Sequence, residues 1–346
     1  MQPINYIKLW IPIFLFCSSI GCKVSKQNPG GCFPADKLPE YITPLTEFGQ
    51  RSEWSLDGRW VYFVDKAGGE VWKINIKTKI PVQLSTEDFR PEGHGYYRVY
   101  ELSNGDLLFT CGPERHDLYI QILPKGSKGP PLKIDERIDE GPAISRTDLK
   151  IVWTPDQQVI YSGKISYQNG KPEIVDKKLI IDNDSVIVNG IKYDGILEPQ
   201  NFIRPAEEIF TWTQYGNTED GLFTSEVMGF NLKTGEITNF SKSPNQYSEP
   251  EGIYPDGQYT LIESDQHSYK GVKHIDVYKL KLDGTGKDLV RITFFNDLED
   301  YKGSNPVVRD DGKMFAFQAA YAKAATGVGC GIYLFDIERW KDLDKR

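Results

Sequence analysis

Residues 51–63 have the sequence RSEWSLDGRWVYF, in which an Asp-Gly pair separates two short strand-like runs. Such a pair closes a tight hairpin, because glycine accepts a positive φ and the Asx side chain bonds its own backbone. Two further strand-like runs follow at residues 70–76 and 81–85. The stretch therefore predicts a unit of four short strands.

The same turn recurs along the chain. Its copies are Asn104-Gly105, Asp256-Gly257 and Asp311-Gly312, with Asp148-Leu149 as a degenerate copy. The interval between Asp148 and Asp256 is about twice the others, and residues 206–208, just before the run 209–213, stand where a hidden copy is expected. The pattern predicts six repeated units.

Alternating runs such as residues 275–282 and 331–337 have the period of two that marks a β-sheet, and no segment longer than two turns has helical periodicity. Four-stranded units of this length fit a β-propeller, in which each blade buries its faces against its neighbours. We expect an all-β fold, a propeller of six four-stranded blades. Seven blades remain an alternative if residues 150–205 hold another unit.

The ends of the repeat predict how the ring closes. The last unit, residues 305–340, ends before it reaches an outer strand like residues 289–293. Residues 41–46 resemble that missing strand. We expect this N-terminal strand to complete the last blade, which would remove an exposed strand edge.

Three of the units carry a family resemblance. Residues 54–58, 251–257 and 307–312 resemble the PD40, or TolB-like, propeller repeat, and the resemblance covers nearly all of residues 40–340. The resemblance implies the propeller fold and says little about function, because this fold hosts many activities.

The first residues predict the compartment. Residues 9–20 are mostly apolar but too short to span a bilayer comfortably, as in a secretory leader. Residues 19–22 resemble a bacterial lipoprotein cleavage box that would leave Cys22 lipidated. We expect a signal peptide at 1–21, a lipidated tether at 22–39, a single propeller domain at 40–346 and a place in the bacterial cell envelope. An ordinary cleaved signal and a buried N-terminal strand are the alternatives.

Composition bounds the partners. Hydrophobic residues make up 39% of the chain, enough for a core, and the net charge of −8 gives no global basic field of the kind that binds nucleic acid. Without Cys17 in the leader and the lipidated Cys22, three cysteines remain at Cys32, Cys111 and Cys330. This odd set implies neither a zinc site nor a disulfide framework.

The strand order predicts one functional face. In a propeller the loops between blades and the loops between second and third strands open on the same side, and all four histidines fall in such loops or at strand ends on that side. Polar residues gathered there are typical of a binding face. The substrate-binding candidates are Arg51, Arg115, His116, Gln200, Glu249, Glu251 and Gln318.

The segment 92–98 is the sharpest candidate. His94 lies between two glycines, which leave backbone room for a ligand, and it is close in sequence to Tyr97 and Arg98. A loop histidine bonded to a neighbouring carbonyl is the alternative. His267 and His274 are candidate ligands for a divalent metal, although their spacing matches no standard zinc pattern.

A looser resemblance points to chemistry. Residues 93–98, 167–172 and 296–306 are similar to segments of propeller proteins related to oligogalacturonate and rhamnose-glucuronate lyases. The resemblance implies β-elimination on uronic-acid glycosides, with His94 as base, Arg98 or Arg115 as carboxylate clamp and Tyr97 as acid. The chain does not reproduce the multi-histidine metal cluster of oligogalacturonate lyases. The resemblance therefore implies a lyase that uses no metal or one that acts on a different uronate.

The competing hypothesis is a non-catalytic scaffold that holds a glycan or an envelope protein on the same face. The partners expected are therefore a glycan or oligosaccharide, the membrane through the N-terminal lipid and, in the scaffold case, an envelope protein. Convergence of His94, Arg98 and His116 in one pocket would favour the enzyme.

Overall fold

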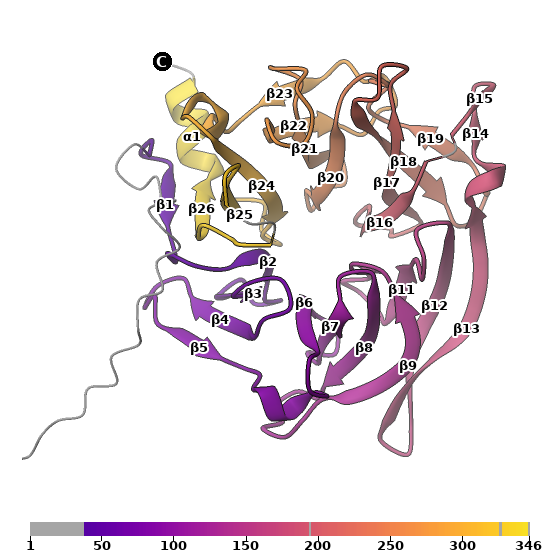
Figure 1. The fold of residues 1–346 in the computed structure, drawn as a ribbon, viewed down its shortest axis with the longest axis vertical. Coiled ribbons are helices and arrows are strands. Elements are labelled where there is room, and N and C mark those ends of the chain that lie inside the picture. The colour runs from indigo at the N-terminus through magenta and orange to yellow at the C-terminus, as the bar shows by residue number, and fades with distance from the viewer. Residues whose placement is uncertain (1–37, 194, 325–326, 345–346) are drawn as a thin grey trace, which may run out of the picture.

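The computed structural model describes residues 38–193, 195–324 and 327–344. These residues form six four-stranded antiparallel sheets arranged as the blades of a ring, which confirms the predicted β-propeller (Figure 1). The expected signal peptide, lipidated Cys22 and most of the tether lie outside the described residues.

Blades 1 to 3 follow one another along the chain. Blade 1 contains β2 (Gln50–Trp54), β3 (Trp60–Val64), β4 (Val71–Asn75) and β5 (Pro81–Gln83). Blade 2 contains β6 (Gly95–Glu101), β7 (Leu107–Glu114), β8 (Asp117–Leu123) and β9 (Leu132–Ile138). Blade 3 contains β10 (Ala143–Ile144), β11 (Lys150–Trp153), β12 (Val159–Gln168) and β13 (Lys171–Asp182).

Blades 4 to 6 complete the ring. Blade 4 contains β16 (Leu197–Phe202), β17 (Ile209–Asn217), β18 (Phe223–Asn231) and β19 (Ile237–Asn239). Blade 5 contains β20 (Ser248–Ile253), β21 (Tyr259–Ser264), β22 (Asp276–Lys281) and β23 (Leu289–Arg291). Blade 6 contains β24 (Tyr301–Val308), β25 (Met314–Tyr321), β26 (Ile332–Asp336) and β1 (Ile42–Pro44).

The Asx turns form for the predicted reason. In blade 1, Gly58 has φ +64°, and the Asp57 carboxylate accepts the Arg59 backbone N–H at 3.0 Å. At the hidden copy before β17, Glu207 takes the left-handed conformation with φ +50° in place of a glycine. The prediction of six units is confirmed.

The long stretch before β16 holds no seventh blade. The strands β12 and β13 of blade 3 are 10 and 12 residues long, and a separate hairpin of β14 (Ile187–Val188) and β15 (Ile191–Lys192) follows them. This extension accounts for the length of residues 150–205, whereas the doubled interval between turns comes from the hidden copy at Glu207 (Figure 1).

The ring closes through its N-terminal strand, as predicted. Strand β1 pairs antiparallel with β26, with Ile42 opposite Phe335 and Pro44 opposite Tyr333. Blade 6 begins at Tyr301, four residues earlier than the predicted unit. A helix that the sequence patterns did not indicate, α1 (Ile337–Asp344), follows β26, and its Trp340 ring contacts the Phe335 ring.

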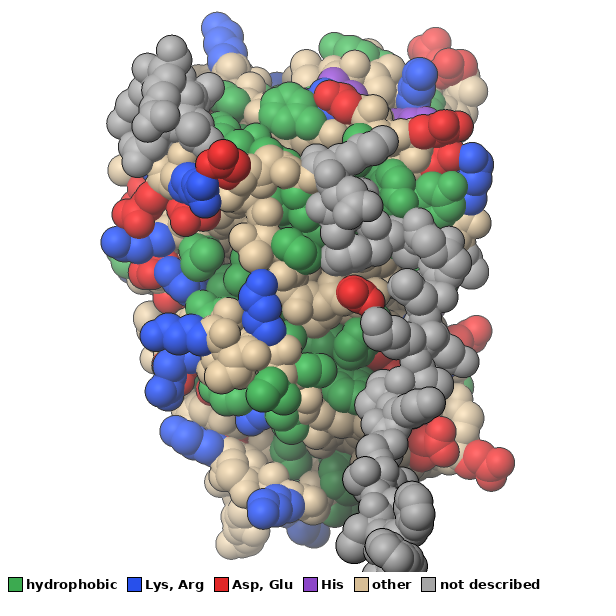
Figure 2. All heavy atoms as spheres, turned by 90° about the vertical axis from the view of Figure 1, so that its left-hand side faces the viewer, with side chains coloured by type: hydrophobic (Ala, Val, Ile, Leu, Met, Phe, Trp, Pro, Cys, Tyr) green, Lys and Arg blue, Asp and Glu red, His purple; other side chains and the backbone are tan. Residues whose placement is uncertain are grey.

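Large side chains between the blades form the core. Trp54, Trp153 and Trp212 are fully buried, and the Trp54 indole donates a hydrogen bond to the Val307 carbonyl of blade 6 at 2.8 Å. On the outer side that carries β1 and β5, basic and acidic side chains are interspersed (Figure 2). No helix among the described residues is both long and apolar enough to cross a membrane.

The cysteines differ from expectation. Cys111 is a free, buried thiol, but Cys330 is disulfide-bonded. The odd cysteine count implied no disulfide framework, but it does not exclude a single disulfide, and the structure has one at Cys330.

Candidate functional site

A cavity of about 700 Å³ lies where the inner strands meet, on the side where the loops between blades open. Residues of β2, β6, β16, β20 and β24 line it, so five of the six inner strands contribute. Because the blades follow one another around the ring, blades 1 and 2 face blades 4 and 5 across this cavity (Figure 1).

Blades 1 and 2 contribute three arginines to the cavity, Arg51, Arg98 and Arg115. All three bind one carboxylate, Glu140, which lies between blades 2 and 3. The Arg51 Nη1 to Glu140 Oε2 distance is 2.6 Å, the Arg98 Nε to Glu140 Oε2 distance is 3.7 Å, and Arg115 contacts Glu140 Oε1. We call these four residues the arginine cluster.

The arginine cluster carries surplus positive charge, because one carboxylate faces three guanidinium groups. Burial and the charge of Arg98 lower the pKa of Arg51 to about 10. Burial and the charge of Arg51 likewise lower the pKa of Arg115. This side of the cavity is therefore suited to an anionic group of a ligand.

Blades 4 and 5 contribute four carboxyl groups, which we call the carboxyl wall: Glu198 of β16, Glu249 and Glu251 of β20, and Glu263 of β21. Each is at most 6% exposed. The cavity is thus polarised, with the arginine cluster on one side and the carboxyl wall on the other.

One phenol bridges two members of the carboxyl wall. The Tyr215 hydroxyl lies 3.0 Å from Glu198 Oε2 and 2.9 Å from Glu249 Oε1. A phenol has one proton to donate, so both contacts are hydrogen bonds only if one carboxyl group is protonated and donates to the phenol oxygen. Glu249 accepts two further hydrogen bonds, from Tyr247 and Gln200, whereas Glu198 accepts one, from Gln157, so we assign the proton to Glu198.

The titration behaviour of the wall agrees with this assignment. Burial and the charge of Glu249 raise the pKa of Glu198 to about 7. Burial and Glu249 also raise the pKa of Glu263 to about 7 and that of Glu251 well above its usual range. Carboxyl groups that are packed together out of water stay protonated at a pH at which exposed carboxyl groups are ionised.

Asn305 fixes two of these groups in place. Its backbone N–H donates to Glu263 Oε1 at 2.6 Å, and its side-chain amide donates to Glu251 Oε1 at 2.6 Å. The carboxyl wall is therefore held by protein hydrogen bonds before any ligand arrives.

We expect stability to fall as pH rises from about 5 to about 7, because the folded state holds protons on Glu198 and Glu263 that the unfolded chain has already lost. Glu198→Gln copies the protonated form and should reduce that fall. Urea unfolding at several pH values measures it. Equal pH slopes for the wild type and the variant would contradict the protonation of Glu198.

An aromatic face adjoins the carboxyl wall. The rings of Tyr215 and Phe223 stack with centroids 5.2 Å apart, and the Tyr247 ring lies 6.2 Å from that of Phe223. Phe223 is 37% exposed, unlike the fully buried Tyr96 of the core. We call Tyr215, Phe223 and Tyr247 the aromatic face.

Most predicted site residues do converge. The cavity is lined by Arg51, Tyr97, Arg98, Arg115, His116, Glu249, Glu251 and Gln318, and Gln200 reaches it through its hydrogen bond to Glu249. His116 lies at the mouth, 57% exposed, with Nδ1 3.0 Å from Asp139 Oδ1.

His94 does not join them. Its Nδ1 lies 3.3 Å from the Tyr119 hydroxyl of blade 2, and it is not among the residues that line the cavity. The loop folds back because Arg90 donates to the His94 carbonyl at 2.6 Å and pairs with Glu70. Arg98 and His116 line one cavity and His94 does not, so the convergence that would favour an enzyme with His94 as base is not formed.

The two metal candidates also lack a ligand set. Both ring nitrogens of His267 are engaged, with Tyr278 at 3.0 Å and Asn296 at 2.9 Å. Within the described ranges, no three or more His, Cys, Asp or Glu side chains are grouped as a metal site.

Sequence reasoning did not single out the cavity residues Glu198, Tyr215, Phe223, Glu263 and Lys302, nor Glu140, which pairs with the cavity arginines. Glu198 precedes Gln200 by two positions, so the alternation of an inner strand was the available signal. Tyr215, Phe223 and Glu263 lie on second and third strands, where nothing in the sequence separates a cavity position from a core one.

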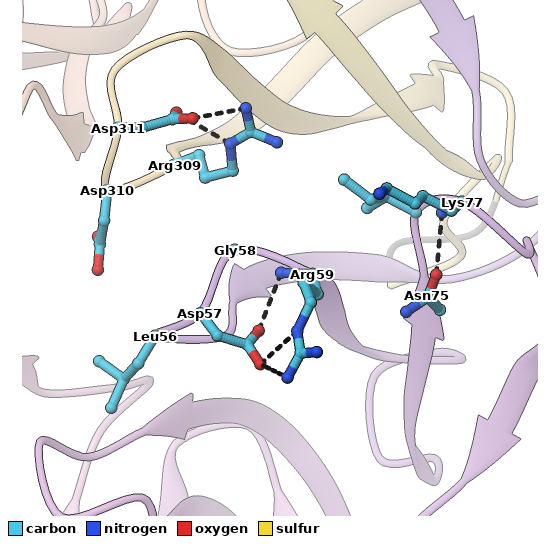
Figure 3. Close-up of a pocket in the computed structure, with 10 residues that line it drawn as sticks. Leu56, Asp57, Gly58, Arg59, Asn75, Lys77, Arg309, Asp310 and Asp311 are labelled. Atoms are coloured by element: carbon cyan, nitrogen blue, oxygen red, sulfur yellow. Dashed lines mark hydrogen bonds and ion pairs between the residues drawn. The ribbon is translucent and has the colours of Figure 1, made fainter.

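A second cavity of about 510 Å³ lies on the opposite, hairpin side between blades 6 and 1 (Figure 3). Two of its arginines pair with near neighbours, Arg59 with Asp57 at 2.6 Å and Arg309 with Asp311 at 2.7 Å, and its Asp310 pairs with Arg146 and Arg204. These ion pairs leave the central cavity as the better candidate site.

The fold and the cavity define a six-bladed β-propeller with a polarised central site. No family model matches the chain, and no curated protein matches it in sequence. Among solved structures it is similar to regucalcin, a calcium-binding protein from Agrobacterium tumefaciens str. C58, with a TM-score of 0.53 and 8% identity over 85% of this chain and 90% of that chain.

It is also similar to TolB from Acinetobacter baumannii, with a TM-score of 0.50 and 12% identity over 85% of this chain and 65% of that one. An oligogalacturonate lyase from Vibrio parahaemolyticus matches with a TM-score of 0.45 and 12% identity, over 86% and 93% of the two chains. At these identities the likeness is one of fold, and the predicted TolB-like resemblance is confirmed at that level.

Proposed function

We propose that this protein is an envelope-anchored propeller that binds a glycan in its central cavity. The observation that carries the proposal is the aromatic face beside fixed hydrogen-bonding groups. A sugar ring presents apolar C–H groups to an aromatic ring and hydroxyl groups to carboxylates, amides and guanidinium groups.

The envelope part of the proposal rests on the N-terminal sequence, with Cys22 as the lipidated residue. The disulfide at Cys330 supports export, because disulfides persist mainly in oxidising compartments.

The second candidate is a lyase that acts on uronic-acid glycosides, and one observation favours it. β-Elimination needs a base whose pKa lies near neutral, and Glu198 has such a pKa in the same cavity as Arg115, the most exposed guanidinium of the arginine cluster at 43%. Glu198, not His94, is then the base, and Arg115 holds the uronate.

The test of glycan binding uses the full chain with Cys22→Ala, which leaves every described residue in place. Calorimetry with a panel of neutral and uronic-acid oligosaccharides should reveal binding that Phe223→Ala weakens about tenfold. The matched control is Phe294→Ala, another exposed phenylalanine, 48% exposed and absent from the cavity lining.

The outcomes separate the hypotheses. Rising ultraviolet absorbance from unsaturated uronates that Glu198→Gln abolishes and His94→Ala leaves intact supports the lyase. Binding without that signal supports a binding protein. No binding to any glycan, together with a stable complex with an envelope protein, contradicts glycan recognition and leaves the scaffold.

A further inference from the structure

Among the described residues, none of the four carboxyl groups of the wall forms an ion pair, although the arginine cluster favours their ionised forms from across the cavity. Lys302 favours the ionised form of Glu263, but its own pKa is lowered by burial. Lys302 and the exposed Lys273, which also lines the cavity, do not balance four carboxyl groups. The proton that Glu198 holds toward the Tyr215 hydroxyl offsets part of the negative charge of the wall, and a ligand cation would offset the same charge.

An orphaned hydroxyl group points to a ligand at the same wall. Ser304 is 3% exposed and lines the cavity next to Asn305. Its Oγ has no hydrogen-bond partner among the described residues. A buried hydroxyl without a partner costs free energy, so this atom is a vacant hydrogen-bonding position for a bound group.

The aromatic face adds a second feature that suits a cation. The stacked rings of Tyr215 and Phe223 lie directly beside Glu198 and Glu249, because Tyr215 also provides the bridging hydroxyl. Aromatic faces attract ammonium groups, and carboxylates beside them strengthen that attraction.

We propose that the carboxyl wall, Ser304 and the aromatic face form a subsite for a protonated amine. The glycan bound here then contains an amino sugar whose amino group is not acetylated. This inference rests on the proposed function, since it names the class of glycan that the same cavity takes. The arginine cluster, on the opposite side, then receives an anionic or hydroxyl group of a neighbouring sugar.

An organic ammonium suits this wall better than a bare metal ion. Glu198, Glu249, Glu251 and Glu263 already accept hydrogen bonds from amide and phenol groups, so a metal would compete for the same oxygens. An ammonium group donates three hydrogen bonds at ordinary distances and leaves those contacts in place.

Binding of an amine should release a proton. The charged and titratable side chains that interact with Glu198 are Glu249, Arg115, Tyr215, Arg98, Arg51 and Tyr247, and the Gln157 amide donates a hydrogen bond to it. A bound ammonium adds positive charge and favours the ionised carboxylate, which lowers the pKa of Glu198 below its value in the free protein. The proton passes to the buffer, and the number released follows from calorimetry in buffers of different ionisation enthalpy.

The experiment compares a β-1,4-linked glucosamine tetramer with its N-acetylated counterpart, on the full chain carrying Cys22→Ala. At about pH 6, where the amine and Glu198 both carry protons, we expect the amino form to bind at least about tenfold more tightly and to release protons. Glu198→Gln should abolish the proton release while the protein stays folded, because glutamine can donate to Tyr215 as the acid does. Glu92→Gln, an exposed charge removal outside the cavity, is the control.

Each outcome decides between the two proposals. Equal binding of the amino and N-acetyl forms without proton release overturns the amine subsite and leaves glycan binding intact. Binding of uronic-acid oligosaccharides alone does the same. If none of these oligosaccharides binds, both the subsite and the proposed function fail. Equal proton release by the wild type and Glu198→Gln would show that another group is the acid, which contradicts the subsite described here.

Discussion

Glu140→Gln is expected to lower the free energy of unfolding by about 3 kcal/mol. The Glu140 side chain is 4% exposed, and it pairs with Arg51 and Arg98, which are 12% and 13% exposed. Glutamine keeps the shape of the side chain but removes the charge, so the guanidinium groups are left together out of water without their nearest counterion. Urea unfolding monitored by tryptophan fluorescence gives the value.

The control for Glu140 is an ion pair on the surface. Lys133 and Asp135 are 52% and 98% exposed with their charged atoms 3.2 Å apart, and Asp135→Asn should leave the unfolding midpoint unchanged. If Glu140→Gln also leaves it unchanged, the arginines are balanced by groups other than Glu140, and the positive surplus assigned to the arginine cluster is wrong.

Ile42→Ala is the second substitution with a large expected effect, a loss of about 3 kcal/mol in the free energy of unfolding. Ile42 lies in the short closing strand β1, is 6% exposed and packs in the core cluster that includes Phe335. Truncation leaves a cavity where the first and last parts of the chain meet. Hydrogen exchange of the β26 amides should quicken in the same variant, because those amides depend on the closing strand.

Thr43→Ala is the matched control on the same strand. Thr43 points to solvent, so its truncation removes no buried contact. Similar losses for Ile42→Ala and Thr43→Ala would mean that the pairing of β1 with β26, and not the packing of Ile42, holds the ring closed.

The propeller was predictable because its signals are local. A turn such as Asp57-Gly58 is decided by the conformations of a few consecutive residues, and so is each of its copies. Even the hidden copy was found by spacing, although Glu207 supplies the left-handed residue where glycine was expected. The ring closure followed from counting strands in the first and last units.

The site was only partly predictable, because it is assembled from blades that are far apart in sequence. The strand order alone predicts which loops open on the functional side of the ring. That prediction identified the cavity arginines and Glu249. It failed for His94, whose ring direction depends on a fold-back held by Arg90. It could not find Tyr215, because the bridging of Glu198 and Glu249 exists only once blades 4 and 5 meet.

The pairing of β1 with β26 also sets an order of events in folding. Phe335 pairs with Ile42 only after all of the intervening chain has been made, so this ladder is the most non-local strand pairing among the described residues. Blades can form one after another from local hairpins, while the sealing of the ring waits for the last strand. Until then the edge of β1 stays unpaired. In a newly made chain, this exposed strand edge can form hydrogen bonds with a strand of a neighbouring molecule.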